Sequence, residues 1–136
     1  MSALAEKPDR VKRLFVSTDL NKSDIFAINV TKNGEKKLVT IDGCIPCKQK
    51  RVAFSTANGN ELWVLLLEKV WAKLHGDYCR IIGGLPHETF RDMTGAPGYM
   101  YQSKKGEVTW DMIKKADKLD HMLAGGIAGQ TQKEVD

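Results

Sequence analysis

The sequence has no apolar run long enough to cross a membrane. Its longest run, LWVLLL at residues 62–67, is far shorter than the roughly 20 apolar residues that a transmembrane helix needs. Residues 1–11 lack the apolar core of a signal peptide. They are also polar and lie at a chain terminus, so we expect them to be disordered. Only three cysteines are present, an odd number, which favours reduced thiols in the cytoplasm over a disulfide framework.

The positive charges are not concentrated in one part of the chain. The net charge is +4, but the lysines and arginines occur in short, separated clusters. A nucleic-acid-binding surface needs basic residues gathered on one face and interleaved with aromatic residues. We therefore expect no nucleic-acid partner and interpret these clusters as solvated faces and loops.

The first half of the sequence has the alternating pattern of antiparallel strands. Residues 24–30 place Phe26, Ile28 and Val30 on one face, as in a half-buried strand. Asn33-Gly34 then favours the positive φ angles of a tight hairpin turn, and residues 38–42 are expected to form the returning strand. The pattern also predicts weaker strands at residues 13–17 and 52–54.

From Glu61 onward the hydrophobic residues recur with a helical period. Their spacing predicts two adjacent apolar rows, made of Leu62, Leu66, Val70 and Leu74 and of Trp63, Leu67 and Trp71. A narrow outer face remains for the other residues, namely Glu61, Leu65, Glu68, Lys69, Ala72 and Lys73. We therefore predict a long, buried helix.

The predicted helix has recognisable end signals. Residues 58–61, with the sequence NGNE, have the character of a capping box, and Gly76 is suited to a left-handed C-terminal residue. The rest of the chain offers few apolar residues to cover this helix. That shortage predicts an exposed apolar surface and self-association.

Two shorter helices are expected in the second half. Pro86 suits the first turn of a helix that runs to Gly95. Thr109 is expected to cap a third helix that carries Trp110 and Ile113. Strands thus precede helices without a repeating strand–helix–strand order, which predicts an α+β fold with small antiparallel strands and one long buried helix.

Many spaced positions in this sequence resemble the protease core of the calpain family, calcium-dependent cysteine endopeptidases with a papain-like fold. The matching helix and the segment after it contain Glu61, Leu62, Trp63, Leu66, Leu67, Glu68, Lys69, Val70, Trp71, Ala72, Lys73, Gly76, Tyr78, Gly83, Gly84, Glu88, Phe90, Asp92, Thr94 and Gly95. The paired strands around Asn33-Gly34 also resemble those of the family. The resemblance implies a partial papain-like fold, with residues 12–84 in the first lobe and 85–136 at the start of the second.

The family's chemistry requires a cysteine nucleophile, a histidine base and an asparagine that orients the histidine. None of the three family motifs for these residues occurs in this sequence, so we assign no catalytic residue. Cys44, Cys47 and Cys79 are not followed by the tryptophan of the nucleophile motif. We interpret the chain as the middle of a protease core and expect it to be inactive alone.

The resemblance implies two functional roles. Glu61 matches an acidic residue that binds calcium in the family's first lobe, although one carboxylate would hold calcium weakly and Glu61 also suits a helix cap. Gly83 and Gly84 match the backbone that pairs with the substrate peptide, where a side chain would block close approach. A flexible joint between lobes is the alternative interpretation of these glycines.

Other interpretations have less support. Cys44 and Cys47, with His75 and Cys79, could be drawn as a zinc site, but a single CxxC is weak and the last two residues straddle a helix end. The tryptophans, at helical spacing in an apolar stripe, are expected to be core residues rather than a stacking site.

Two hypotheses of function follow. In the first, the chain is a portion of a cytoplasmic calpain-type protease, which acts on peptide or protein substrates when it is complete or complemented by another chain. In the second, it is a non-catalytic calpain-like module that binds peptides or protein partners.

Overall fold

The computed structural model describes residues 1–19, 22–59, 61–101 and 110–126. The chain divides into two compact units, residues 1–99 and 100–136. Among the described residues, none of the helices combines the length and the apolar character that a membrane span requires. The predicted division into lobes at residues 84 and 85 stays a prediction.

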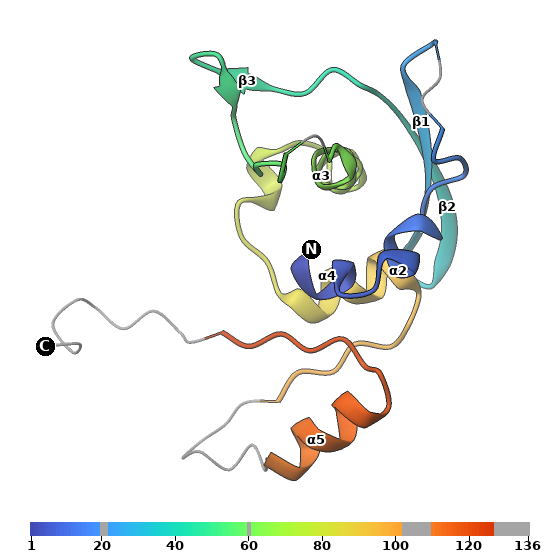
Figure 1. Ribbon diagram of the computed structural model, residues 1–136, viewed down its shortest axis with the longest axis vertical. Coiled ribbons are helices and arrows are strands. Elements are labelled where there is room, and N and C mark those ends of the chain that lie inside the picture. Colours follow the sequence, from blue (N-terminus) through green and yellow to red (C-terminus); the bar gives the residue numbers. More distant parts are fainter. Residues whose placement is uncertain (20–21, 60, 102–109, 127–136) are drawn as a thin grey trace, which may run out of the picture. The chain divides into compact units, whose positions relative to one another are not determined.

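An antiparallel hairpin forms the sheet of the first unit. Strands β1 (Ile25–Lys32) and β2 (Glu35–Asp42) pair over their whole lengths (Figure 1). Asn33 and Gly34 form the connecting turn with φ angles of 54° and 81°, which confirms the turn predicted from this dipeptide. Phe26, Ile28 and Val30 are buried on one face, as their alternation predicted.

The N-terminal residues are ordered into two short helices, so the expected disorder of residues 1–11 is not what the structure shows. Helix α1 spans Ser2–Ala5 and helix α2 spans Pro8–Lys12. Leu4 and Val11 are buried and join the core, and burial of these side chains holds the segment in place. The strand predicted at residues 13–17 is reduced to a single bridge between Phe15 and Ile28.

Helix α3 (Trp63–His75) is the long helix that the hydrophobic period predicted. Its N-cap is Leu62, without a side-chain capping bond, so the predicted capping box is wrong. Gly76 ends the helix with φ 111° and ψ −55°, a positive φ as expected but outside the regular left-handed helical region.

The face assignment within α3 was partly wrong. Leu65 and Ala72, predicted on the outer face, are buried, whereas Leu62, predicted in an apolar row, is 48% exposed. Leu67 and Val70 are completely buried. Neighbouring residues therefore cover part of the face of α3 that was predicted to be exposed to solvent.

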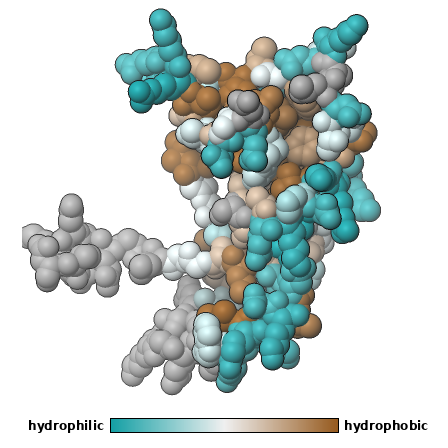
Figure 2. All heavy atoms as spheres, viewed as in Figure 1, coloured by the Kyte–Doolittle hydropathy of each residue, from teal (hydrophilic) through white to brown (hydrophobic). Residues whose placement is uncertain are grey.

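Helix α3 contacts β2, η1 and β1, and its buried side chains belong to the core of the first unit. The core is made of apolar side chains from α1, α2, the segment after α2, the hairpin, α3 and α4: Leu4, Val11, Leu14, Phe26, Ile28, Val30, Ile41, Leu65, Leu66, Leu67, Val70, Ala72 and Met93. The expected shortage of covering residues is thus wrong. Some apolar side chains remain exposed, and hydrophobic atoms appear between hydrophilic ones on the visible face (Figure 2).

Short elements complete the first unit. Strands β3 (Cys47–Lys48) and β4 (Arg51–Val52) form a small second hairpin, close to the weak strand predicted at residues 52–54. A 3₁₀ turn, η1 (Cys79–Ile81), follows α3. Helix α4 (Pro86–Thr94) starts at Pro86 and is closed by Gly95 as its C-cap, as predicted, and it contacts β1.

The described part of the second unit contains helix α5 (Trp110–Lys118), which confirms the third predicted helix. Thr109, its predicted cap, lies outside the described residues. Trp110 and Ile113 are exposed within this part of the chain, 67% and 38% respectively.

Candidate functional site

Gly83 and Gly84 lie in the connection between η1 and α4. Both are exposed, and a Cβ atom added at either position would meet no atom within 4 Å. Neither has a positive φ angle. The local structure of this chain therefore does not itself require glycine at these positions, which leaves room for a requirement imposed by something that binds there.

The neighbours of this glycine pair are apolar and open. Ile82 is 81% exposed and Leu85 is 45% exposed. Four consecutive residues thus present backbone and apolar side chains to the surface, flanked by the 3₁₀ turn on one side and α4 on the other. Such a segment has space for an extended peptide to approach its backbone.

Glu61 lies just before α3, and its side chain is exposed. Its Oε2 atom accepts a hydrogen bond from Trp63 Nε1 at 3.1 Å. Glu61 also borders an apolar groove of about 520 Å³, formed mainly by α1, α2, Phe15, Phe26 and the start of α3. It precedes the N-cap residue Leu62, so the alternative role as the helix cap is not the one seen here.

The calcium role of Glu61 requires partners. Calcium takes six to eight oxygen ligands. Within the described ranges, no three residues of the types His, Cys, Asp and Glu lie close enough together to hold a metal ion. Glu61 thus belongs to no such cluster among the described residues, and its calcium role stays a prediction. The same observation applies to the alternative zinc site at Cys44, Cys47, His75 and Cys79.

Cys44 lies beside a carboxylate that disfavours its ionisation. Asp42 Oδ1 accepts a hydrogen bond from the backbone N–H of Cys44 at 2.8 Å. Hydrogen bonding to the Asp42 side chain and the negative charge of that group raise the pKa of the Cys44 thiol. A raised pKa leaves less thiolate at neutral pH, the opposite of what a cysteine nucleophile needs.

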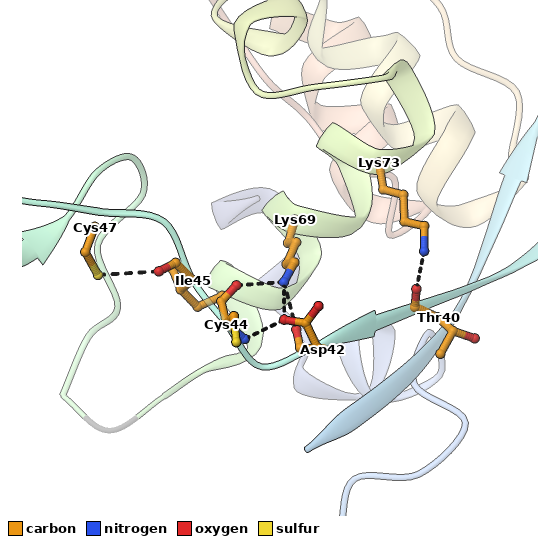
Figure 3. A network of polar contacts seen from close by, with 7 residues as sticks. All are labelled: Thr40, Asp42, Cys44, Ile45, Cys47, Lys69 and Lys73. Atoms are coloured by element: carbon orange, nitrogen blue, oxygen red, sulfur yellow. Dashed lines mark hydrogen bonds and ion pairs between the residues drawn. The ribbon is translucent and has the colours of Figure 1, made fainter. Parts of the chain in front are cut away.

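Lys69 of α3 sets the geometry around Asp42 (Figure 3). Its Nζ atom donates to Asp42 Oδ1 at 2.6 Å and to the carbonyl oxygen of Cys44 at 2.6 Å. The hydrogen bond from Lys69, followed by that from the Cys44 N–H, lowers the pKa of Asp42 to about 2. Lys73, one turn later, donates to the carbonyl oxygen of Thr40 at 2.7 Å. These contacts attach α3 to the end of β2.

A second polar cluster joins three elements that are far apart in the sequence. Lys32, at the end of β1, donates to Asp92 Oδ2 of α4 at 2.6 Å and to His75 Nε2 of α3 at 2.9 Å. His75 Nδ1 donates to the carbonyl oxygen of Trp71 at 2.9 Å. Both ring nitrogen atoms of His75 are therefore engaged.

Asp92 is the buried member of this cluster, with only 1% of its surface exposed. Burial acts to raise the pKa of its carboxyl group, but hydrogen bonds from Lys32 and Arg91 and their positive charges outweigh burial and lower it. The cluster is therefore a satisfied structural network. Sequence reasoning missed it, because nothing local connects Lys32 with Asp92.

The described cysteines and histidines do not form a catalytic pair. All three cysteines are free and exposed. Among the described residues, no cysteine donates to or accepts from a histidine side chain. The structure thus places Glu61 and the Gly83–Gly84 pair at the surface of the first unit, and in the part of the chain that it describes it brings no cysteine and histidine side chains together.

Comparison with known proteins gives the following matches. The family model described as calpain family cysteine protease matches residues 1–136. The calpain-type cysteine protease DEK1 of Zea mays is 32% identical over 112 residues, which cover 81% of this chain and 5% of that protein. Calpain-8 of Rattus norvegicus is 36% identical over 114 residues, covering 82% of this chain and 16% of that protein.

A further match is the calpain-1 catalytic subunit of Mus musculus, which is 39% identical over 105 residues. That alignment covers 76% of this chain and 15% of the mouse protein. The chain therefore spans between 5% and 16% of the length of these relatives.

Proposed function

Because this chain belongs to the calpain family of cysteine proteases, we propose that it is one portion of the protease core of a calcium-dependent, cytoplasmic endopeptidase. Its α+β architecture is consistent with a portion of the calpain protease core. On its own, the 136-residue chain does not hydrolyse peptides. The observation that carries this second statement is that no cysteine side chain is hydrogen-bonded to a histidine side chain among the described residues, whereas Cys44 lies beside the Asp42 carboxylate.

Peptide hydrolysis by a cysteine protease needs a thiolate and an imidazole within hydrogen-bonding distance. Asp42 raises the pKa of the Cys44 thiol and so disfavours the thiolate. His75 is engaged by Lys32 and by the Trp71 carbonyl, so it cannot accept a proton from a thiol without losing a structural contact. We therefore infer that this portion has a structural role within a larger protease, in which other segments supply the reacting groups.

The Gly83–Gly84 segment is the part that contributes to substrate binding. It offers exposed backbone in a region without side-chain obstruction. An extended peptide can form main-chain hydrogen bonds there in the manner of an added strand. In the complete protease, the substrate is a peptide or an unfolded stretch of a protein.

Glu61 supplies one carboxylate toward a calcium ion in the complete protease. Its exposed position at the start of α3 leaves the carboxylate accessible to further ligands from another segment or a complementing chain. Calcium binding by this chain alone is expected to be weak or undetectable, because one carboxylate supplies at most two of the required oxygen atoms.

The test is an activity assay on the purified 136-residue chain with a fluorogenic calpain peptide, with and without calcium. We expect no turnover in either condition. The matched variants Cys44→Ala, Cys47→Ala and Cys79→Ala are assayed beside it. Calcium-dependent turnover that one of these substitutions abolishes would refute the proposal.

The second candidate function is a non-catalytic, peptide-binding module, and the open Gly83–Gly84 segment is what favours it. The two functions differ in what surrounds this chain in the cell. The intact mass of the native protein, together with the coding sequence on both sides, distinguishes them. A native mass near 15.2 kDa supports the module, whereas a larger product with Cys-Trp and Gly-His-Ala motifs supports the protease.

A further inference from the structure

The outer edge of β2 carries backbone groups that the hairpin does not use. In an antiparallel pair, residues alternate between those that bond to the partner strand and those whose N–H and C=O point away from it. The two-residue turn makes Lys32 and Glu35 a bonded pair. Counting from this pair, the N–H and C=O groups of Lys36, Leu38, Thr40 and Asp42 point outward from β2.

Independent contacts confirm this alternation. The carbonyl of Ala27 and the N–H of Asn29, the partners of Thr40 and Leu38 in the register, point away from β2. They form hydrogen bonds with Val16 N and Leu14 O, at 3.0 and 2.7 Å. The outer edge of β1 is therefore covered by residues 14–16, which leaves β2 as the exposed edge of this sheet.

Only one end of the β2 edge is occupied. Lys73 donates to the carbonyl oxygen of Thr40, and Lys69 donates to that of Asp42. Closer to the turn, the outward groups of Lys36 and Leu38 have no hydrogen bond to any described residue. The Leu38 side chain is 61% exposed on the same stretch. An exposed edge of this kind is a template for another strand.

The charges along the edge indicate what kind of strand it accepts. Lys36 and Lys37 have no ion-pair partner among the described residues, and Lys73 contacts a backbone carbonyl rather than a carboxylate. Glu35, the first residue of β2, is the acidic residue nearest to them in the strand. The unoccupied stretch is thus a positively charged surface, which favours acidic side chains on the incoming strand.

A second copy of this chain fits the edge poorly. Antiparallel pairing of two β2 edges about Leu38 would place Lys36 of one copy opposite Thr40 of the other. The Thr40 carbonyl already carries the Lys73 ammonium group, so like charges would meet twice across the contact. Such an arrangement is unfavourable.

We propose that the outer edge of β2, at Lys36 and Leu38, binds an extended acidic peptide segment of a protein partner by strand addition. The N–H groups of Lys36, Leu38 and Thr40 and the carbonyl oxygens of Lys36 and Leu38 supply the main-chain hydrogen bonds. The lysines select acidic side chains. This surface is formed by β2 and α3 and does not include Gly83, Gly84 or Glu61.

The test uses the 136-residue chain and a fluorescently labelled peptide of about eight residues that alternates Glu and Val. The decisive variant is Leu38→Pro, which removes an outward N–H that β1 does not use, and proline is tolerated at such edge positions. Leu38→Thr is the matched control, because it shortens the same side chain but retains the N–H group. Lys36→Gln tests the charge.

We expect Leu38→Pro to weaken binding about tenfold, through the lost hydrogen bond and the steric obstruction of the edge, and Leu38→Thr to change it less than threefold. Lys36→Gln is expected to weaken binding and to reduce its sensitivity to salt. A peptide that alternates Lys and Val should not bind. Equal binding by the Pro and Thr variants, or by the two peptides, overturns the proposal.

Amide hydrogen exchange on the unmodified chain provides a readout that does not depend on the folding of a variant. Saturation with the acidic peptide should slow exchange at the Leu38 amide and leave the Val39 amide, which is already bonded to β1, unchanged. Unchanged exchange at Leu38 overturns the proposal. Self-association that Leu38→Pro abolishes also overturns it, because a second copy would then be the occupant.

Discussion

Lys32→Met is the substitution that most directly tests the polar cluster between β1, α3 and α4. Methionine retains an unbranched side chain of similar length but removes the ammonium group that contacts Asp92 and His75. Asp92 is 1% exposed and the Lys32 side chain is 24% exposed, so the substitution leaves a buried carboxylate without its shortest hydrogen bond. We expect the chain to lose free energy of unfolding.

The size of this loss depends on Arg91, the partner of Asp92 that remains in the variant. Breaking a buried ion pair from one side costs about 3–5 kcal/mol. Here Arg91 Nε still donates to Asp92 Oδ1 at 3.0 Å, from a side chain that is 45% exposed and therefore partly screened. We therefore expect a loss of about 2–3 kcal/mol. Lys37→Met, on the neighbouring strand and exposed, is the control and should change stability by less than about 0.5 kcal/mol.

The loss of stability in Lys32→Met should depend on pH, whereas a loss caused by packing alone would not. The pKa of Asp92 is lowered in the folded chain, so its interactions stabilise the fold above the unfolded value of 3.8. That contribution is lost as the pH falls below this value. In Lys32→Met, burial of Asp92 opposes its ionisation and only Arg91 still favours it. Protonation of Asp92 at low pH should therefore restore part of the stability that the substitution removes.

Urea unfolding followed by tryptophan fluorescence, at about pH 5 and pH 3, measures both effects, since carboxyl groups titrate between these values. The difference in stability between the unmodified chain and Lys32→Met should be large at pH 5 and clearly smaller at pH 3. A difference that is the same at both pH values would show that lost packing, not the carboxylate, causes the destabilisation. A variant as stable as the unmodified chain would contradict the argument entirely.

Three further predictions concern backbone strain and thiol chemistry. Lys50 has a φ angle of 63° in the β3–β4 turn, so Lys50→Gly should raise the free energy of unfolding by up to about 1 kcal/mol, whereas Lys50→Ala should not. Asp42→Asn removes the charge that raises the pKa of Cys44, so iodoacetamide should label Cys44 several times faster at pH 8, with the other two thiols as internal references. Gly95→Ala should lower the free energy of unfolding by about 1–2 kcal/mol, because φ is 75° and the new Cβ would lie 3.0 Å from Thr31 Oγ1. Gly84→Ala is the control, because its new Cβ lies in open space, and it should leave stability unchanged. A lower melting temperature for Gly84→Ala than for Gly95→Ala would refute the reasoning.

The elements that could be predicted from the sequence are those with strong local signals. The hairpin has alternating apolar residues on both sides of an Asn-Gly turn, and these two signals also determine the register once one face is buried. Helix α4 has Pro86 at its start and Gly95 at its end. Each of these features is contained within a few neighbouring residues, so no knowledge of the tertiary contacts was needed.

The errors arose where distant residues decide the outcome. Leu65 and Ala72 lie beside the polar stripe of α3 in a helical projection, and only their burial among distant residues shows that they belong to the core. Leu4 and Val11 are isolated apolar residues in a polar segment, and their burial likewise depends on tertiary packing. Periodicity reports how wide an apolar stripe is, but not how much of the helix its neighbours cover.

The candidate site shows the same division. Gly83, Gly84 and Glu61 were identified from a spaced pattern of residues, and their calcium and substrate roles stay predictions. The contacts that position the glycines could not be identified this way. Lys32 and Asp92 are 60 residues apart, and no local rule relates two such residues.

Helix α3 connects these contacts to the glycine segment. On its β2 side, Lys69 and Lys73 bind backbone carbonyls of the second strand, and at its end His75 meets Lys32. Lys32 in turn binds Asp92 on α4, the helix that begins directly after the glycine segment. The helices that precede and follow residues 82–85 are therefore both attached to the hairpin by charged hydrogen bonds, whereas Gly83 and Gly84 have open space around them. An exposed backbone held at both ends keeps its position without packing of its own, which is the property that recognition of an extended peptide requires.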